Sequence, residues 1–159
     1  MPRALAPLFT GARLTVEMVP QPLWALSAKK CVPADQWQRV RGPVLDVASG
    51  RCQVCRAIPD RSLECHEVWT YDDDRCVQRL ADLVALCPDC HGAKTPGRLA
   101  WLAKKDIKYA GLPARSRDHL AAVNGWAPRT VDQYVRWCTQ VNRARSAHVW
   151  SQDLTRFFR

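Results

Sequence analysis

Four of the eight cysteines stand in two pairs with the spacing of metal-binding knuckles, Cys52-x2-Cys55 and Cys87-x2-Cys90. The pairs begin 35 positions apart, and His91 directly follows the second one. Each knuckle brings two thiolates to one point, and four such ligands form the tetrahedron that a structural zinc ion prefers. Redox pairs or unrelated buried cysteines are the alternatives, but two knuckles favour metal binding. We therefore expect these four cysteines to hold a Zn²⁺ ion whose binding contributes on the order of 10 kcal/mol to folding.

Between the knuckles lies the segment Leu63-Glu64-Cys65-His66-Glu67-Val68, which has the residue types of a short strand. The order of knuckle, strand, second knuckle and His91 resembles the HNH endonuclease family over residues 50–97. The resemblance implies a ββα-metal fold, with two antiparallel strands and a helix around one catalytic divalent ion. It also implies a structural four-cysteine zinc. The expected fold class is α+β, with a small zinc-stapled core and helical flanks.

The resemblance also implies roles for particular side chains in phosphodiester hydrolysis, which needs a metal at the phosphate and a base for water. His66 takes a metal-ligand position and His91 the helix-ligand position, with Mg²⁺ or a similar ion between them. Glu67 takes the general-base position, where the family usually has His. Asp82 takes the position of the Asn that orients the base. Thr95 falls where some members have another His.

A second strand register remains open, in which Cys65 is the ligand and His66 the base. It shifts the strand by one residue and turns every side chain to the opposite face. Leu63 and Val68 fit the first register better. Structural roles are also open: His91 could replace a cysteine at the zinc, and His66 could form a hydrogen bond in the core.

Charge is distributed unevenly around this segment. The net charge is +9, and residues 92–159 contain thirteen basic and four acidic residues, whereas residues 51–91 contain five basic and eight acidic residues. A basic surface attracts phosphate backbones, although solvated helix faces are the simpler alternative. The residues expected to contact nucleic acid, with DNA preferred, are Lys94, Arg98, Lys104, Lys105, Arg129, Arg136 and Arg143. His119 and His148 have no ligand spacing around them, so we expect neither to have a special role.

Three regions follow from this organisation: an N-terminal strand and helix (1–49), the cysteine-rich core (50–97) and a basic helical extension (98–159). Strands are expected at 13–19 and 63–70, and residues 77–86 are expected to begin helical and become extended. Helices are expected from Pro33-Ala34, split at Gly42-Pro43, from Pro88 to Pro96-Gly97, at 98–109, at 114–123 and from Pro128 onward. The tail, which holds Trp150, Leu154, Phe157 and Phe158, should pack back onto the core or onto a partner.

The whole sequence contains no apolar run near the roughly 18–20 residues that a membrane helix needs, and residues 1–10 make a poor signal peptide. A cytoplasmic protein without membrane association is expected. The leading hypothesis is an HNH-like, nucleic-acid-binding endonuclease or nickase. The alternative is a catalytically inactive protein of the same fold that acts as an adaptor, regulator or inhibitor. A zinc module that only stabilises a protein-interaction domain is a third reading, and a protein partner or homodimer is possible.

Overall fold

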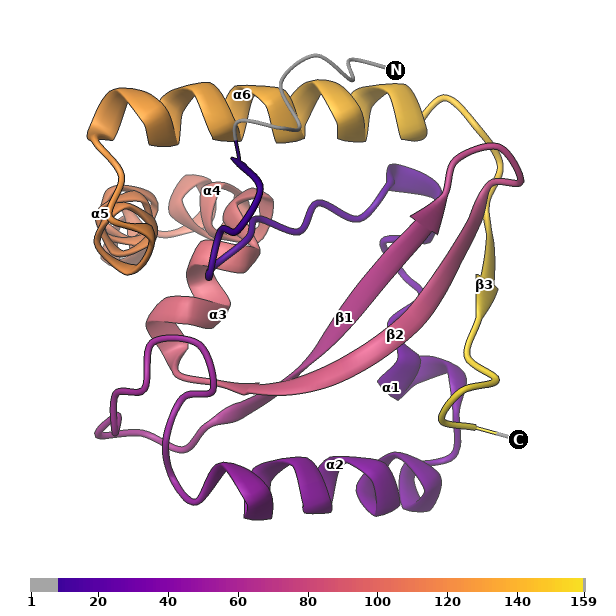
Figure 1. Ribbon diagram of the computed structural model, residues 1–159. Coiled ribbons are helices and arrows are strands. Elements are labelled where there is room, and N and C mark those ends of the chain that lie inside the picture. The colour runs from indigo at the N-terminus through magenta and orange to yellow at the C-terminus, as the bar shows by residue number, and fades with distance from the viewer. Residues whose placement is uncertain (1–8, 159) are drawn as a thin grey trace.

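The computed structural model describes residues 9–158 and has an α+β architecture (Figure 1). A three-stranded sheet in the order β1-β2-β3 crosses the molecule, with α6 along one side and α2 along the other. The elements are η2 (Gln21–Leu23), α1 (Ala28–Cys31), α2 (Ala34–Ala48), β1 (Glu64–Asp72), β2 (Val77–Leu86), α3 (Pro88–Lys94), α4 (Pro96–Lys105), η3 (Ile107–Tyr109), α5 (Leu112–Asn124), α6 (Pro128–Arg145) and β3 (Ser151–Asp153).

Strands β1 and β2 form an antiparallel hairpin, and β3 adds to β2 in parallel. The prediction that residues 77–86 begin helical is wrong, because the whole segment is strand. A bulge explains the misleading pattern. Val68 pairs with Asp82 but Trp69 pairs with Leu80, so β2 has one extra residue between its two partners. Burial therefore changes from even positions such as Leu80 to odd positions such as Leu83, and the alternation typical of a strand is lost.

Helix α2 begins at Ala34, as the sequence predicts, but it runs unbroken through Gly42-Pro43. The predicted split is wrong. Proline removes one backbone hydrogen bond from a helix interior, and burial of Trp37 and Val44 against the sheet holds the helix together around it. Ser49 then adopts a left-handed conformation (φ 50°) and ends the helix.

The segment 13–19 was expected to be a strand, but it pairs with no strand. It is held instead by single hydrogen bonds from distant elements. The Asn124 amide oxygen accepts from the Arg13 and Leu14 N–H groups, and the Tyr134 hydroxyl accepts from Val16 N–H. The Asn142 amide donates to the Met18 carbonyl. Leu14 is fully buried, so the apolar alternation reports burial correctly although no sheet forms.

Two hydrophobic clusters occupy the two sides of the sheet. The first joins the cysteine knuckles to α3, α5 and α6 through Leu14, Leu86, Leu120, Val131 and Tyr134. The second lies under α2 and includes Trp37, Trp69, Leu80 and Leu83, with Leu154, Phe157 and Phe158 packed against it. The prediction that the tail packs back is confirmed, since Trp150 is buried as well.

Two helices differ in length from their predicted ranges. The helix expected at 98–109 is α4, which begins at Pro96 and ends at Lys105, with η3 following it. Pro96 therefore opens a helix, because proline suits the first turn, whereas α3 has already ended at Lys94. The helix expected at 114–123 is α5, extended by a residue or two at each end and closed by Gly125 in a left-handed conformation.

Candidate functional site

The four knuckle cysteines converge on one point, as their spacing predicts. Their sulfur atoms all lie within 4.8 Å of one another. The sulfurs of Cys55 and Cys87 are 3.7 Å apart, close to the roughly 3.8 Å edge of a tetrahedron with ~2.3 Å zinc–sulfur bonds. This cluster could hold a metal ion such as zinc.

Thiol electrostatics at the cluster also suit a cation. Burial opposes ionisation of Cys52, but backbone N–H groups of Cys87, Cys55 and Val54 outweigh it and hold the Cys52 pKa at about 7. Burial raises the pKa of Cys87 to about 11, and burial with neighbouring thiolates also raises the pKa of Cys90. Four thiolates cannot coexist there without a positive charge, and a bound metal supplies it.

His119 stands beside this cluster, contrary to the expectation of no special role. Its Nε2 lies 3.1 Å from the Cys90 sulfur, and it comes from α5. Burial lowers the pKa of His119, which favours the neutral ring. A neutral imidazole N–H can donate to a metal-bound thiolate as an outer-shell partner. The sequence offers no local signal for it, because 29 positions separate the two residues.

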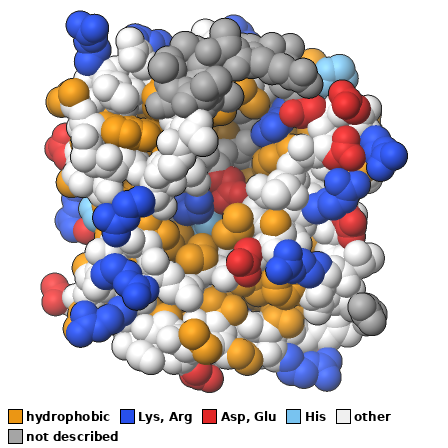
Figure 2. All heavy atoms as spheres, viewed as in Figure 1, with side chains coloured by type: hydrophobic (Ala, Val, Ile, Leu, Met, Phe, Trp, Pro, Cys, Tyr) orange, Lys and Arg blue, Asp and Glu red, His pale blue; other side chains and the backbone are white. Residues whose placement is uncertain are grey.

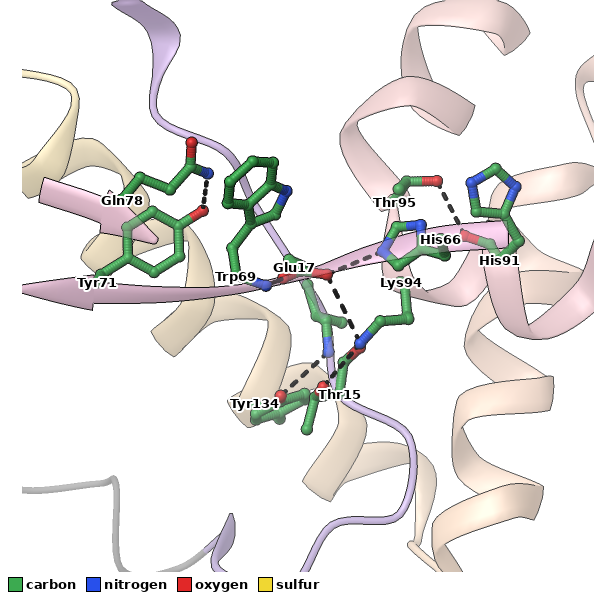
Figure 3. Close-up of polar contacts among 11 residues, drawn as sticks. Thr15, Glu17, His66, Trp69, Tyr71, Gln78, His91, Lys94, Thr95 and Tyr134 are labelled. Atoms are coloured by element: carbon green, nitrogen blue, oxygen red, sulfur yellow. Dashed lines mark hydrogen bonds and ion pairs between the residues drawn. The ribbon is translucent and has the colours of Figure 1, made fainter. Parts of the chain in front are cut away.

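His66 on β1 and His91 on α3 come together beside the knuckles. Their ring centroids lie 5.1 Å apart, in an edge-to-face arrangement (Figure 3). Cys87 caps the N-terminus of α3, so the same cysteine that joins the metal cluster fixes the start of the helix that presents His91. The metal cluster thus positions one of the two histidines directly.

Each histidine is paired with a carboxylate. His66 Nε2 lies 2.8 Å from Glu17 Oε2, and His91 Nδ1 lies 2.9 Å from Glu64 Oε2. A carboxylate only accepts, so the proton is assigned to Nε2 of His66 and to Nδ1 of His91, and the other ring nitrogen of each carries a lone pair. Burial lowers the pKa of His91, with Glu64 opposing the shift.

Glu17, which was not among the expected site residues, is the centre of the polar network. Its second oxygen accepts from the Trp69 backbone N–H at 2.7 Å, and Lys94 Nζ lies 3.7 Å from the first (Figure 3). The side chains of Glu17, His66 and Lys94 are only 10%, 11% and 8% exposed. A lone acid within the apolar alternation of residues 14–18 is the one signal that points to Glu17. Figure 2 shows acidic, basic and histidine side chains together in a central hollow of this face.

The structure separates Glu67 and Cys65 from the histidines, because successive residues of a strand face opposite ways. Glu67 turns toward the N-terminal layer and accepts from the Lys29 backbone N–H at 3.3 Å, and burial raises its pKa. Cys65 packs into the hydrophobic cluster under α2. Neither residue shares the face of His66, so the roles expected for Glu67 as base and Cys65 as ligand are corrected.

Asp82 and Thr95 also make no contact with the two histidine rings through their side chains. Asp82 is exposed, and its carboxylate accepts from the adjacent Leu83 N–H. The Thr95 hydroxyl donates to the His91 carbonyl at 3.0 Å. The carboxylate that contacts the His66 ring is that of Glu17, not that of Asp82.

Of the residues expected to bind phosphates, Lys94 is misplaced. It is buried and donates to the Thr15 backbone carbonyl and hydroxyl, so it is a structural cation. The other six residues, Arg98, Lys104, Lys105, Arg129, Arg136 and Arg143, are exposed. They lie on α4 and α6.

Two cavities flank Glu17, which lines both. One has a volume of about 410 Å³ and reaches toward α6 and the hairpin turn, where Arg145 forms a two-bond ion pair with Asp73. The other has a volume of about 570 Å³ and opens between residues 17–27 and the start of α4. Both volumes are typical of small-ligand clefts.

Comparisons with protein-family models, curated proteins and solved structures give no match to the chain. Among residues 9–158, none of the helices combines the length and apolarity that crossing a bilayer requires. The candidate site is therefore defined by its own geometry: four cysteines that could hold a metal ion, and beside them two carboxylate–imidazole pairs, one of which contains the buried Glu17.

Proposed function

We propose that this protein is an HNH-like endonuclease or nickase that hydrolyses phosphodiester bonds in nucleic acid, most favourably DNA. The observation that carries the proposal is the pairing of Glu17 with His66 and of Glu64 with His91, on rings only 5.1 Å apart. Two oriented imidazoles at one strand–helix junction provide a general base and a ligand for a divalent ion, and both can act on the same phosphate. The adjacent cysteine cluster, with zinc bound, would hold that junction rigid.

His66 is assigned as the general base. Glu17 accepts a hydrogen bond from Nε2–H of His66. The other ring nitrogen, Nδ1, therefore keeps the lone pair that can take a proton from an attacking water. The Glu17 carboxylate also stabilises the imidazolium that forms. This arrangement orients the ring and sets its tautomer, as the carboxylate does in other carboxylate–histidine catalytic pairs.

A divalent ion is assigned to Glu64 and His91. Their closest atoms, Nδ1 and Oε2, are 2.9 Å apart, and adjacent ligands on an octahedral ion with bonds of ~2.1 Å lie roughly 3 Å apart. A ligating nitrogen needs its lone pair, so an ion bound there would replace the hydrogen bond between Nδ1 and Oε2, and the ring proton would move to Nε2. Mg²⁺ commonly takes one or two protein ligands and completes its shell with water and phosphate oxygens. The ion would polarise the scissile phosphate, while Glu64 is about half exposed and accessible to it.

The alternative is a catalytically inactive protein that binds nucleic acid or a protein partner. One observation favours it: within the described part of the chain, only the four cysteines bring three or more potential metal ligands within 4.8 Å. Lys94 also competes for Glu17, because its ammonium lies 3.7 Å from the oxygen that holds His66. The six exposed basic residues would serve binding in either case.

A cleavage assay with supercoiled plasmid tests the proposal. The purified protein is incubated with plasmid and Mg²⁺, Mn²⁺ or Ni²⁺, beside the His66→Ala and His91→Ala variants and a matched His148→Ala control. His148 is exposed and lies outside the site. We expect nicking by the parent and the control, and a loss of roughly 100-fold or more with His66→Ala.

Cleavage that is equal in the parent and in His66→Ala would refute the assignment of the base. No cleavage with any metal, combined with plasmid binding that weakens as salt rises, would instead support the inactive alternative.

A further inference from the structure

The larger cavity contains chemistry that the hydrolytic site does not use. Its volume is about 570 Å³, and three of the seven tryptophans of the chain line it: Trp24, Trp69 and Trp101. Trp24 and Trp101 are 69% and 54% exposed, which is unusual for side chains of this size. Large aromatic rings left open to solvent in a cleft indicate a ligand with a flat face.

Trp24 is a fixed surface, not a loose side chain. Its indole N–H donates to the Val19 carbonyl at 2.8 Å, and η2 holds the backbone that precedes it. The ring is therefore oriented before any ligand arrives, so little side-chain entropy is lost on binding.

Positively charged side chains lie next to the indole ring of Trp101. The ammonium of Lys105 lies 4.0 Å above its ring. Arg98, one turn earlier on α4, is exposed and also lines the cavity. Arg98 is the cation among the lining residues, with Lys105 beside it at Trp101. The acids Glu17 and Glu67 also line the cleft. The positive charge therefore lies on the α4 side. Aromatic walls with cations on that side match a ligand that is flat, apolar on its faces and attached to negative charge.

The cavity borders the hydrolytic site at Glu17. The carboxylate that holds His66 also lines this cavity, and so does Thr95, four residues beyond His91. Glu17 and Thr95 thus form a wall that the cavity shares with the surroundings of the histidine pair.

We propose that this cavity binds an unpaired nucleobase, stacked on Trp24 and Trp101, and that the substrate is single-stranded or locally unpaired nucleic acid. The inference rests on the proposed function, because the phosphate position comes from the histidine site. Base–aromatic stacking tolerates any base, so no sequence preference is implied. An apolar side chain of a partner protein is the competing occupant, and it does not account for the cations at the rim.

Binding of two oligonucleotides with the same backbone charge tests the proposal. One is a labelled twelve-residue oligothymidylate and the other is a twelve-residue strand of abasic sites. Both are titrated by fluorescence anisotropy into the full-length, zinc-loaded His66→Ala protein, so that nothing is cleaved. We expect the strand with bases to bind about 5- to 150-fold more tightly, the range seen when one stacking aromatic is removed.

Trp24→Ala and Trp101→Ala, each added to His66→Ala, should reduce that difference while the salt dependence of binding stays the same. Ile107→Ala is the matched control, because Ile107 is 87% exposed, apolar and in the same basic segment but does not line the cavity. Equal affinity for the two strands, or no effect of either tryptophan substitution, would overturn the proposal. A neutral, leucine-rich peptide probes the competing occupant. If Trp24→Ala weakens binding of this peptide but leaves binding of the oligothymidylate unchanged, the proposal is also overturned. These measurements involve no cleavage, so their outcome is independent of the plasmid assay. Base stacking can be refuted while nicking is observed, and nicking can be absent while stacking is observed.

Discussion

Removal of the Glu17 carboxylate tests most directly how the buried polar network contributes to stability. Glu17→Ala leaves His66 Nε2 and the Trp69 backbone N–H without their acceptor, and it leaves the Lys94 ammonium buried without its counter-ion. Taking one partner from a buried ion pair destabilises a protein by about 3–5 kcal/mol. Lys94 keeps two contacts to Thr15, so we expect the lower half of that range, about 3–4 kcal/mol.

Urea unfolding followed by circular dichroism measures this effect in the zinc-loaded protein. With a denaturant dependence of about 2 kcal/mol/M, the midpoint should fall by roughly 1.5–2 M. Glu17→Gln keeps an acceptor oxygen and should be less destabilising. Asp35→Ala is a matched control, because Asp35 and Arg39 form an ion pair in which both side chains are 70% exposed, and such pairs contribute less than about 1 kcal/mol.

A double substitution separates charge pairing from packing. Glu17→Gln with Lys94→Met removes both charges, so the pair of substitutions should be less destabilising than the sum of the two by about 1–3 kcal/mol. Strict additivity, or a loss below about 1 kcal/mol for Glu17→Ala, would refute the view that Glu17 is the electrostatic centre of the site.

Three further predictions concern the metal cluster, the buried acid and one strained residue. Stripping the metal with a chelator at pH 7 should unfold the protein, because a structural zinc contributes on the order of 10 kcal/mol; identical thermal unfolding with and without chelator would contradict this. For Glu67, burial raises the folded-state pKa above the ordinary 4.5, so its contribution to stability is complete below that pH and is lost as pH rises through the raised value. The unfolding free energy of the parent minus that of Glu67→Gln should therefore fall as pH increases from about 4.5 in a series of urea titrations, and a flat profile would disprove it. Arg56 follows the first knuckle with φ 68°, so Arg56→Gly should stabilise the protein by about 0.5–1 kcal/mol in the same assay, whereas Arg56→Ala should give no gain.

The parts of the site that the sequence predicted are those encoded by local geometry. A CxxC spacing brings two sulfurs to one side of a turn, whatever the rest of the chain does, so the four-cysteine cluster was predictable. The proximity of His66 and His91 was an expectation from the resemblance to the HNH family, and the short distance from Cys90 to His91 along the chain is its only local part.

The parts that could not be predicted depend on distant contacts or on one irregular residue. Glu17 reaches His66 across 49 positions from a segment without regular structure, so no period or motif connects them. The strand β2 was misread because its bulge reverses the alternation of burial between Leu80 and Leu83. Lys94 looked like a surface cation since nothing in its neighbours reveals that Thr15 and Glu17 enclose it.

The way residues 13–18 are held also sets an order for folding during synthesis. Their hydrogen-bond partners Asn124, Tyr134 and Asn142 lie 110 to 124 positions later in the chain. The cysteine cluster can close once residue 90 has emerged, and Thr15 and Glu17 can contact Lys94 soon after. The hydrogen bonds to Asn124, Tyr134 and Asn142 form only when α5 and α6 are present. Such high contact order slows folding. The segment that presents Glu17 to His66 is therefore fixed at both ends only after α6 has left the ribosome.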